Sequence, residues 1–263
     1  MADLSAPNPL KELFKAGKIA LGMNIRVARS PDIARVAKTC GHDFIFIDCQ
    51  HSLFSVETVG AIAQVALGCG IAPLVRVRSY DDANTQVLLD NGVTGIVFPD
   101  VNTAEQARCA VSLAKFPPVG TRSVAGGYPI FDYRPLPATD TVPALNENTV
   151  VACMIETEQG LNNVEEIAAV PGVDVIHVGS SDLLTAMGRP GSYGSPEHLA
   201  AMDRVIRAAL KNGKVPGIGG DRNVARQVEF IRKGARFLTT NSDIAFMLAE
   251  GSRVTGELRK ALG

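Results

Sequence analysis

Eight short apolar or β-branched runs recur along the chain, and a stretch with helical periodicity follows each of them. Continuous apolar strands of this kind suit a parallel sheet covered on both faces. Alternation repeated about eight times favours a (β/α)8 barrel over a doubly wound sheet, which usually has fewer strands. The expected strands are Ile19–Ile25, Phe44–Asp48, Ala72–Arg78, Gly95–Pro99, Val150–Glu156, Val175–Gly179, Val215–Gly219 and Phe237–Asn241.

The stretches between these strands are amphipathic, and their ends carry helix signals. Ser30-Pro31 and Ser195-Pro196 resemble an N-cap followed by proline at the first helical position. Glycine stands where most of these helices should stop. The expected helices are Ser30–Thr39, Ser55–Leu67, Asp82–Asp90, Ala104–Lys115, Asn162–Ala169, Pro196–Lys211, Arg222–Lys233 and Ser242–Leu262.

Length and charge narrow the class of protein. The chain has 263 residues, a length typical of an eight-unit barrel, so we expect residues 1–263 to form one α/β domain. A net charge of −1 without a run of like charges argues against nucleic acid as a partner. The first residues do not show the basic segment followed by an apolar one that is typical of a secretory signal. No apolar stretch is long enough to span a membrane. Five cysteines without CxxC spacing indicate reduced thiols, so we expect a cytoplasmic protein.

One interval interrupts the alternation. Residues Phe116–Asn148 form a long connection rich in Pro, Gly and Tyr. Long unstructured connections inside compact domains tend to be lids, binding loops or assembly elements. The alternative is a simple surface excursion.

Ionisable side chains stand at the ends of several otherwise apolar strands. The second strand leads into Asp48 and His51, the third carries Arg76, the fifth ends at Glu156, and the sixth leads into Asp182. In barrel enzymes, function gathers at the carboxyl ends of the strands. We therefore expect these side chains to meet at one mouth of the barrel.

Glu156 and Asp182 suggest a cation site with oxygen ligands. A divalent ion such as Mg²⁺ takes one or two carboxylates and completes its shell with water or substrate oxygens. The alternative is that a strand-end acid caps the next helix or pairs with an arginine, and Asp182 stands where an N-cap would be. Spacing alone leaves both readings open.

The other strand-end residues have complementary chemistry. An imidazole at His51, held by the Asp48 carboxylate, can move a proton near neutral pH. Arg76 can bind a carboxylate or stabilise an enolate oxygen, and the backbone N–H groups of Gly179-Ser180-Ser181 can bind a substrate carboxylate. The remaining histidines are expected elsewhere, His177 inside the barrel and His42 and His198 facing solvent.

Six motifs in order resemble the HpcH/HpaI aldolase family of class II, metal-dependent pyruvate aldolases, from about Leu21 to the C-terminus. Together they are specific, although each alone is weak. They are Phe-Ile-Asp48-Cys-Gln-His51-Ser, Pro-Leu-Val-Arg76, Leu-Leu-Asp90-Asn-Gly, Pro-Pro-Val-Gly-Thr-Arg122-Ser, Met-Ile-Glu156-Thr and Val-Gly-Ser-Ser-Asp182-Leu.

The resemblance implies a (β/α)8 barrel that often assembles as a hexamer, a trimer of dimers that exchange the last helix. It implies that Glu156 and Asp182 hold a divalent cation (Mg²⁺, Mn²⁺ or Co²⁺). It further implies that His51, supported by Asp48, is the acid–base residue, and that Arg76 polarises the ketone oxygen of pyruvate.

By the same resemblance, Asp90 reaches a neighbouring subunit's site. Arg122 and the Gly126–Arg134 loop are our candidates for selecting the aldehyde, and the alternative for Arg122 is that it only braces the loop. The activity implied is reversible cleavage of a 4-hydroxy-2-oxo acid to pyruvate, or a related 2-oxo acid, and an aldehyde.

The chain also departs from the family pattern. Gln50 stands where many members have glutamate before the histidine, and Gly179-Ser180-Ser181-Asp182 replaces Gly-Pro-Ala-Asp. Residues 125–148 match poorly. These departures leave the residues that would bind the metal and pyruvate in place. They affect the half of the site that would bind the aldehyde.

Three alternative functions remain at this point. One is a lyase acting on a CoA thioester such as malyl-CoA or citryl-CoA. The second is a phosphate-binding isomerase, suggested by the glycines of Gly217-Ile-Gly219-Gly220. The third is a non-catalytic barrel that binds 2-oxo acids, against which the retained ionisable residues argue.

Overall fold

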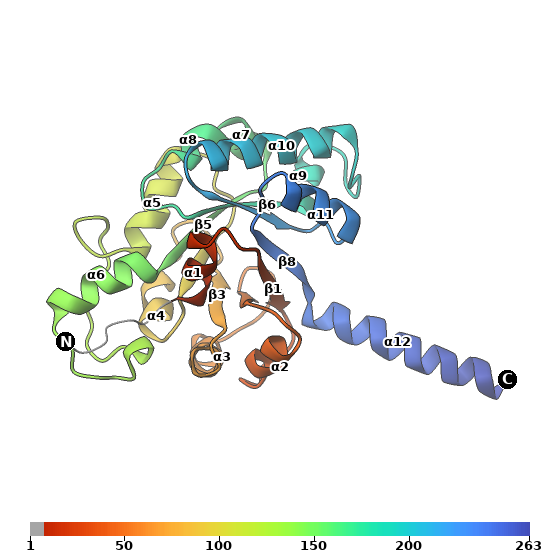
Figure 1. The fold of residues 1–263 in the computed structure, drawn as a ribbon, viewed down its shortest axis with the longest axis horizontal. Coiled ribbons are helices and arrows are strands. Elements are labelled where there is room, and N and C mark those ends of the chain that lie inside the picture. The colour runs from red at the N-terminus through yellow and green to blue at the C-terminus, as the bar shows by residue number, and fades with distance from the viewer. Residues whose placement is uncertain (1–7) are drawn as a thin grey trace.

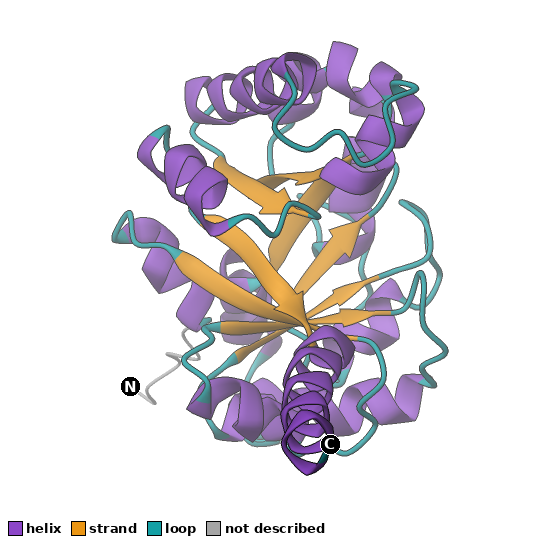
Figure 2. Cartoon of the chain, turned by 90° about the vertical axis from the view of Figure 1, so that its right-hand side faces the viewer, coloured by secondary structure: helices purple, strands orange, loops and turns teal. Residues whose placement is uncertain are grey.

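The strands close into one parallel barrel in a computed structural model that describes residues 8–263. Each strand pairs with the next along the chain, and β8 returns to pair with β1. Helices surround the strands on the outside (Figure 2). The strands are β1 (Ala20–Ile25), β2 (Phe44–Asp48), β3 (Ala72–Arg76), β4 (Gly95–Phe98), β5 (Val150–Ile155), β6 (Val175–Gly179), β7 (Val215–Gly219) and β8 (Phe237–Ser242).

The predicted barrel is therefore confirmed, with strand ends within two residues of those expected. The helices expected between the strands are also present, although Asn162–Ala169 is divided at Asn163 between two short helices. The helices are α1 (Pro9–Lys15), α2 (Ile33–Thr39), α3 (Val56–Gly68), α4 (Thr85–Asp90), α5 (Ala104–Ala114), α6 (Ala138–Asn148), α7 (Glu158–Asn162), α8 (Val164–Ala168), α9 (Ser180–Ala186), α10 (Pro196–Lys211), α11 (Val224–Arg232) and α12 (Asp243–Leu262), with a 3-10 turn at Pro129–Phe131.

Two layers of apolar side chains form the core. The barrel interior holds large residues such as Phe44 and Phe237, whose rings stack with centroids 4.4 Å apart. Leu10 of α1 is fully buried in this interior cluster, so α1 closes the barrel at the amino-terminal ends of the strands. A second cluster lies between the strands and the outer helices. Because α1 and the interior side chains close the amino-terminal end, the barrel is open at the carboxyl ends of its strands.

The sequence suggested an unstructured connection over residues 116–148, but this interval has regular structure. It contains the 3-10 turn and α6, and Phe116, Tyr128, Phe131 and Leu145 form a small core of their own. This interval leads back to the amino-terminal end of β5 and lies beside α1 and α4 (Figure 1). It lines no part of the pocket at the barrel mouth, so it is no lid over that pocket.

The last helix leaves the barrel. α12 begins directly after β8 and projects away from the other helices (Figure 1). Asp243 is its one buried residue, and large apolar side chains such as Met247, Leu248 and Leu258 are exposed along it. Among residues 8–263, no helix combines the length and the apolar character needed to cross a membrane.

Candidate active site

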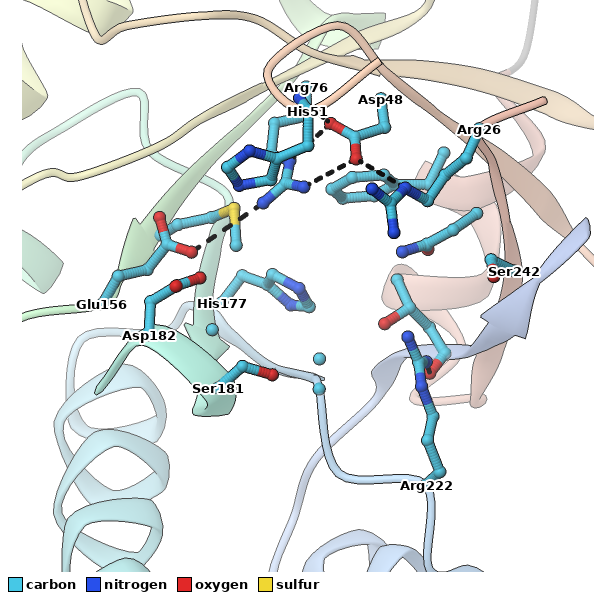
Figure 3. Close-up of a pocket in the computed structure, with 17 residues that line it drawn as sticks. Arg26, Asp48, His51, Arg76, Glu156, His177, Ser181, Asp182, Arg222 and Ser242 are labelled. Atoms are coloured by element: carbon cyan, nitrogen blue, oxygen red, sulfur yellow. Dashed lines mark hydrogen bonds and ion pairs between the residues drawn. The ribbon is translucent and has the colours of Figure 1, made fainter. Parts of the chain in front are cut away.

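A pocket of about 270 Å³ opens at the carboxyl ends of the strands, where barrel enzymes carry their function. Figure 3 shows the side chains that line it. Of the residues expected to act here, the pocket contains Asp48, His51, Arg76, Gly179, Glu156, Ser181 and Asp182.

Arg76 and Asp48 form a buried ion pair at one side of this pocket. The two residues lie opposite each other in the register of β2 and β3. Arg76 donates from Nε to Oδ1 over 3.0 Å and from Nη2 to Oδ2 over 2.8 Å, which is the two-pronged geometry that guanidinium favours. Burial alone would raise the pKa of Asp48, but the hydrogen bonds and charge of Arg76 outweigh it, and the pKa is lowered. Asp48 is thus an anion that fixes the orientation of Arg76.

His51 is exposed at the start of the loop after β2. Its backbone N–H, 3.2 Å from Oδ1, is the group that donates to Asp48. The sequence suggested that the carboxylate holds the imidazole, whereas this hydrogen bond fixes the loop backbone. The ring faces the pocket (Figure 3).

Glu156 is a buried carboxylate, 3% exposed, directly after β5. Its Oε2 accepts the backbone N–H of Asp100 over 3.2 Å, and its Oε1 lies 3.9 Å from Nη1 of Arg76. Burial raises its pKa to about 7, and the nearby Asp182 carboxylate adds to the increase, while Arg76 opposes it. A buried anion that is this poorly compensated favours an additional positive charge beside it.

Neither Glu156 nor Asp182 caps a helix, so the capping alternative has no support. Thr157 caps α7 with its side chain, and Gly179 is the N-cap of α9. Figure 3 shows Glu156 and Asp182 at the same side of the pocket. Both therefore present oxygen atoms to the opening.

Two carboxylates with open space before them fit a hard divalent cation. Within residues 8–263, no group of three or more His, Cys, Asp or Glu side chains is placed to bind a metal ion. The chain would thus supply two carboxylates at most, and substrate and water oxygens would complete the shell. Gly179 makes room for this arrangement, because a Cβ there would lie 2.3 Å from Oε1 of Glu156.

The backbone of the 179–181 segment borders the same side of the pocket. Ser181 is exposed, and its hydroxyl lies 2.8 Å from the hydroxyl of Tyr193. Ser180 is fully buried, does not line the pocket and donates to the sulfur of Met202. Ser180 therefore presents no exposed atom to a substrate, whereas Gly179 and Ser181 line the pocket.

The glycines near β7 serve packing around His177. An added Cβ at Gly217 would lie 2.7 Å from Nδ1 of His177, and one at Gly219 would lie 2.7 Å from Nε2. As expected, His177 is inside the barrel, 1% exposed, and burial lowers its pKa to about 3. The glycine cluster thus accommodates a neutral imidazole, which removes the observation that suggested a phosphate site.

Besides Ser180, two further predicted site residues do not reach this pocket. Asp90, at the end of α4, accepts a hydrogen bond of 2.6 Å from Nη2 of Arg122. The guanidinium of Arg122 is buried over the Phe116 ring, 4.4 Å from its centroid. The two residues bind each other in this chain, and neither lines the pocket.

His42 and His198 are not solvent-facing, so that expectation was wrong. His42 is 7% exposed, and its ring bonds the Ala37 carbonyl and the Thr240 hydroxyl. His198 is fully buried, accepts the Gly194 N–H and packs edge-on against the Phe230 ring. The polar character of the two imidazole rings suggested that they face solvent, whereas each ring is buried and contacts other residues of the chain.

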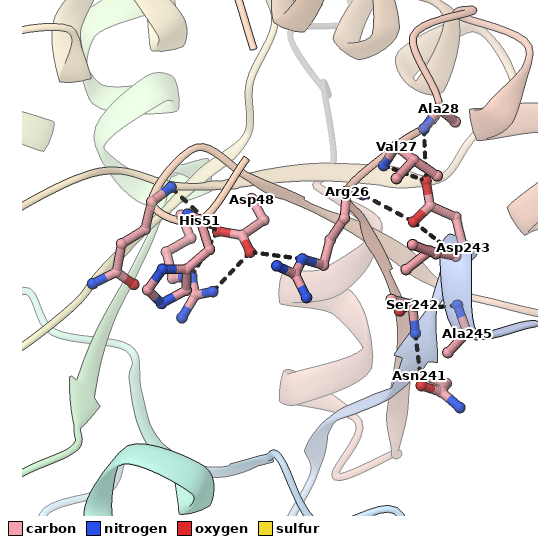
Figure 4. Close-up of polar contacts among 12 residues, drawn as sticks. Arg26, Val27, Ala28, Asp48, His51, Asn241, Ser242, Asp243 and Ala245 are labelled. Carbon is pink, nitrogen blue, oxygen red and sulfur yellow. Dashed lines mark hydrogen bonds and ion pairs between the residues drawn. The ribbon is translucent and has the colours of Figure 1, made fainter. Parts of the chain in front are cut away.

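Sequence reasoning missed two arginines in the pocket, Arg26 after β1 and Arg222 after β7. Nε of Arg26 lies 3.5 Å from Oδ2 of Asp48. The loop that carries Arg26 is bound by Asp243, whose carboxylate accepts the backbone N–H groups of Arg26, Val27 and Ala28 over 2.8–3.0 Å (Figure 4). Arg26 directly follows the expected strand Ile19–Ile25, so the rule that function gathers at the carboxyl ends of strands would have identified it.

Comparisons with known proteins agree with this geometry. The family model described as HpcH/HpaI aldolase/citrate lyase matches residues 26–248. The chain is 39% identical over 210 residues to the 4-hydroxy-4-methyl-2-oxoglutarate aldolase cghB of Chaetomium globosum, covering 79% of this chain and 78% of that one.

It is also 30% identical over 259 residues to a hydroxypyruvate/pyruvate aldolase of Cupriavidus necator, covering 98% of this chain and 94% of the relative. The crystal structure of an HpcH/HpaI aldolase from Desulfitobacterium hafniense superimposes with a TM-score of 0.91 at 30% identity. That superposition covers 95% of this chain and 96% of the other.

Proposed function

The chain belongs to the HpcH/HpaI aldolase/citrate lyase family, and from this premise we propose that its pocket cleaves a 4-hydroxy-2-oxo acid reversibly. The products would be pyruvate, or a related 2-oxo acid, and an aldehyde. The observation that carries the proposal is the convergence of Glu156, Asp182, Arg76 and His51 at one pocket.

The carboxylate pair gives this reaction its metal dependence. Glu156 and Asp182 would hold Mg²⁺, Mn²⁺ or Co²⁺, since oxygen ligands accept all three ions. When bound, the cation supplies a Lewis acid for the 2-oxo acid oxygens. The raised pKa of Glu156, about 7 in the metal-free protein, supports a positive charge beside it.

The protein side chains would handle the remaining charge and the proton. His51 would accept the proton of the 4-hydroxyl as the C3–C4 bond breaks and C4 becomes the aldehyde carbon. The electron pair of that bond would pass to C3 and the 2-oxo oxygen, where Arg76 adds positive charge. The backbone N–H groups of Gly179 and Ser181 would orient the substrate carboxylate.

Metal removal tests the proposal. Pyruvate release from a panel of 4-hydroxy-2-oxo acids should stop in EDTA and return when Mg²⁺ or Mn²⁺ is added. The variants Glu156→Ala and Asp182→Ala should bind no Mg²⁺ in calorimetry while keeping the circular dichroism of the barrel. Full activity in the metal-free protein, or turnover of a CoA thioester in its place, would refute the assignment.

We further propose that Asp90 acts in the site of a neighbouring subunit and that subunits exchange α12 in a hexamer. Support comes from the apolar residues exposed on α12 and from the position of Asp90 outside the lining of its own pocket. Light scattering on a size-exclusion column measures the assembly. Inactive Asp90→Asn and His51→Ala chains, mixed by co-expression, should regain part of the activity, because some of their shared sites would then be complete.

A further inference from the structure

The two carboxylate oxygens of Glu156 have different surroundings. Oε2 accepts the backbone N–H of Asp100, a residue outside the pocket lining, over 3.2 Å. Oε1 lies 3.9 Å from Nη1 of Arg76, a contact drawn in Figure 3, and a Cβ on Gly179 would be 2.3 Å from it. Arg76 and Gly179 both line the pocket. One oxygen is therefore held from outside the pocket, and the other lies among the residues that line it.

Asp100 donates this hydrogen bond from an unusual backbone conformation. It is the second residue after β4, and its φ is +52°, in the left-handed region. Residues other than glycine are strained there, although aspartate and asparagine adopt this conformation more readily than the others. A strained backbone persists only where surrounding contacts enforce it, and such residues cluster at functional sites.

Contacts with β5 and the loop after it enforce this conformation. Asn102 donates from Nδ2 to the carbonyl of Asp100 over 3.0 Å, and its own side-chain oxygen accepts the hydroxyl of Thr157. The next residue after Asp100, Val101, donates its N–H to the carbonyl of Met154 over 3.1 Å. The loop after β4 is thus bound on both sides of the strained peptide, and its direction is fixed relative to β5.

The side chain of Asp100 makes a separate contact with the loop after β2. Nε2 of Gln50 lies 3.4 Å from Oδ2 of Asp100, a length at which a hydrogen bond is weak. Gln50 directly precedes His51, the proposed acid–base residue. The shorter and better defined contact of Asp100 is therefore the one that its backbone makes with Glu156.

We propose that Asp100 is a positioning residue for Glu156, because its left-handed backbone holds Oε2 and so turns Oε1 toward the pocket. Oε1 would then be the oxygen offered to the cation, a part of the inference that rests on the proposed function. In a right-handed or extended conformation the N–H of residue 100 would point in another direction. The carboxylate of Asp100 is not required for this role, since the peptide N–H supplies the contact.

Substitutions that differ in their left-handed preference test the proposal. Asp100→Gly and Asp100→Asn accept the conformation and should bind Mg²⁺ with a Kd within about threefold of the wild-type value. Asp100→Val disfavours it through a β-branched side chain, so other loop conformations should compete and raise the Kd at least about tenfold. Isothermal titration calorimetry measures each Kd.

The chain offers a matched control for the strain itself. Asp132 also has a φ of +52°, and it lies in the interval 116–148, outside the pocket lining. Asp132→Val places the same side chain in the same conformation, so its Tm should fall as that of Asp100→Val does. Its Kd for Mg²⁺ should nevertheless equal the wild-type value. Equal weakening of Mg²⁺ binding in the two valine variants would overturn the proposal.

Amide hydrogen exchange followed by NMR tests the contact without metal or substrate. The Asp100 N–H should be protected in the metal-free protein, and Glu156→Ala should accelerate its exchange at least about tenfold because the acceptor is lost. Glu166→Ala, at an exposed position on α8, should leave this exchange unchanged. Equal exchange of the Asp100 N–H in the two alanine variants would overturn the proposal.

The same measurements separate this inference from the proposed function. Metal-dependent cleavage with an unchanged Mg²⁺ Kd in Asp100→Val would contradict the positioning role alone. Protection of the Asp100 N–H that depends on Glu156, in a protein that binds no Mg²⁺ and is fully active in EDTA, would support the positioning role and contradict the metal-dependent mechanism alone.

Discussion

Gly179 and Glu156 lie so close together that no side chain larger than hydrogen fits between them. A Cβ on Gly179 would be 2.3 Å from Oε1 of Glu156 and 2.7 Å from its Cγ. The glycine ends β6, and the glutamate follows the neighbouring β5. The position of the proposed metal ligand thus depends on the absence of a side chain on the next strand.

We expect Gly179→Ala to displace the Glu156 carboxylate and to weaken Mg²⁺ binding at least tenfold, as changes around metal ligands commonly do. Isothermal titration calorimetry measures the affinity. Gly68→Ala is the matched control, because a Cβ at Gly68 meets no atom within 4 Å. Unchanged Mg²⁺ affinity in Gly179→Ala would show that Glu156 does not hold the ion in this position.

Removal of Arg76 should cost both stability and activity. Arg76→Ala leaves the Asp48 carboxylate, 1% exposed, without its main partner, at a cost of about 3 kcal/mol in the free energy of unfolding. Urea denaturation measures that cost. Arg76→Lys keeps the charge but loses the paired donors, so kcat/KM should fall while stability falls less. Equal stability of Arg76→Ala and wild type would contradict the importance of this ion pair.

The metal-free protein should lose stability as the pH rises. Burial raises the pKa of Glu156 to about 7, so the folded state binds this proton more tightly than the unfolded state does. The free energy of unfolding therefore falls between about pH 5 and pH 8 as Glu156 ionises in the fold.

Glu156→Gln lacks this ionisation and should be more stable than wild type at pH 8 by about 2 kcal/mol, measured in EDTA. The difference should vanish near pH 5. Glu166→Gln, at an exposed position on α8, controls for the loss of one negative charge. A difference that does not vary with pH would exclude Glu156 as its source.

Asp243→Asn should loosen the loop after β1. One carboxylate oxygen accepts the N–H groups of Val27 and Ala28, and an amide cannot accept at both oxygen positions. Hydrogen exchange at residues 26–28 should therefore accelerate at least tenfold. Asp140→Asn changes an exposed acid on α6 and should leave this exchange unaltered. Equal protection of the loop in both variants would mean that Asp243 does not hold it.

The sequence predicted the barrel because strands and helices leave strong local patterns. β2, β6 and β7 begin and end where the apolar runs do. The rule that function lies at strand ends then brought Asp48, Arg76 and Glu156 to one pocket. α6 was missed, because the Pro, Gly and Tyr residues of the interval 116–148 suggested an irregular connection.

What the sequence did not predict depends on contacts between distant residues. Arg222 lies in a loop three residues beyond β7, and its place in the pocket depends on a bond to Thr239 and on the pairing of Asp221 with Arg226. The burial of His42 depends on Thr240, almost two hundred residues away. Such contacts leave no periodic signal in the chain.

The apolar side chains exposed along α12 have a consequence for how stability is measured. A helix of 20 residues is about 30 Å long, and Phe246, Met247, Leu248 and Leu258 along it are all exposed in the single chain. Association that buries them stabilises only the folded protein, so the melting temperature should rise with protein concentration. Dilution should therefore lower the Tm even though no contact within the barrel changes.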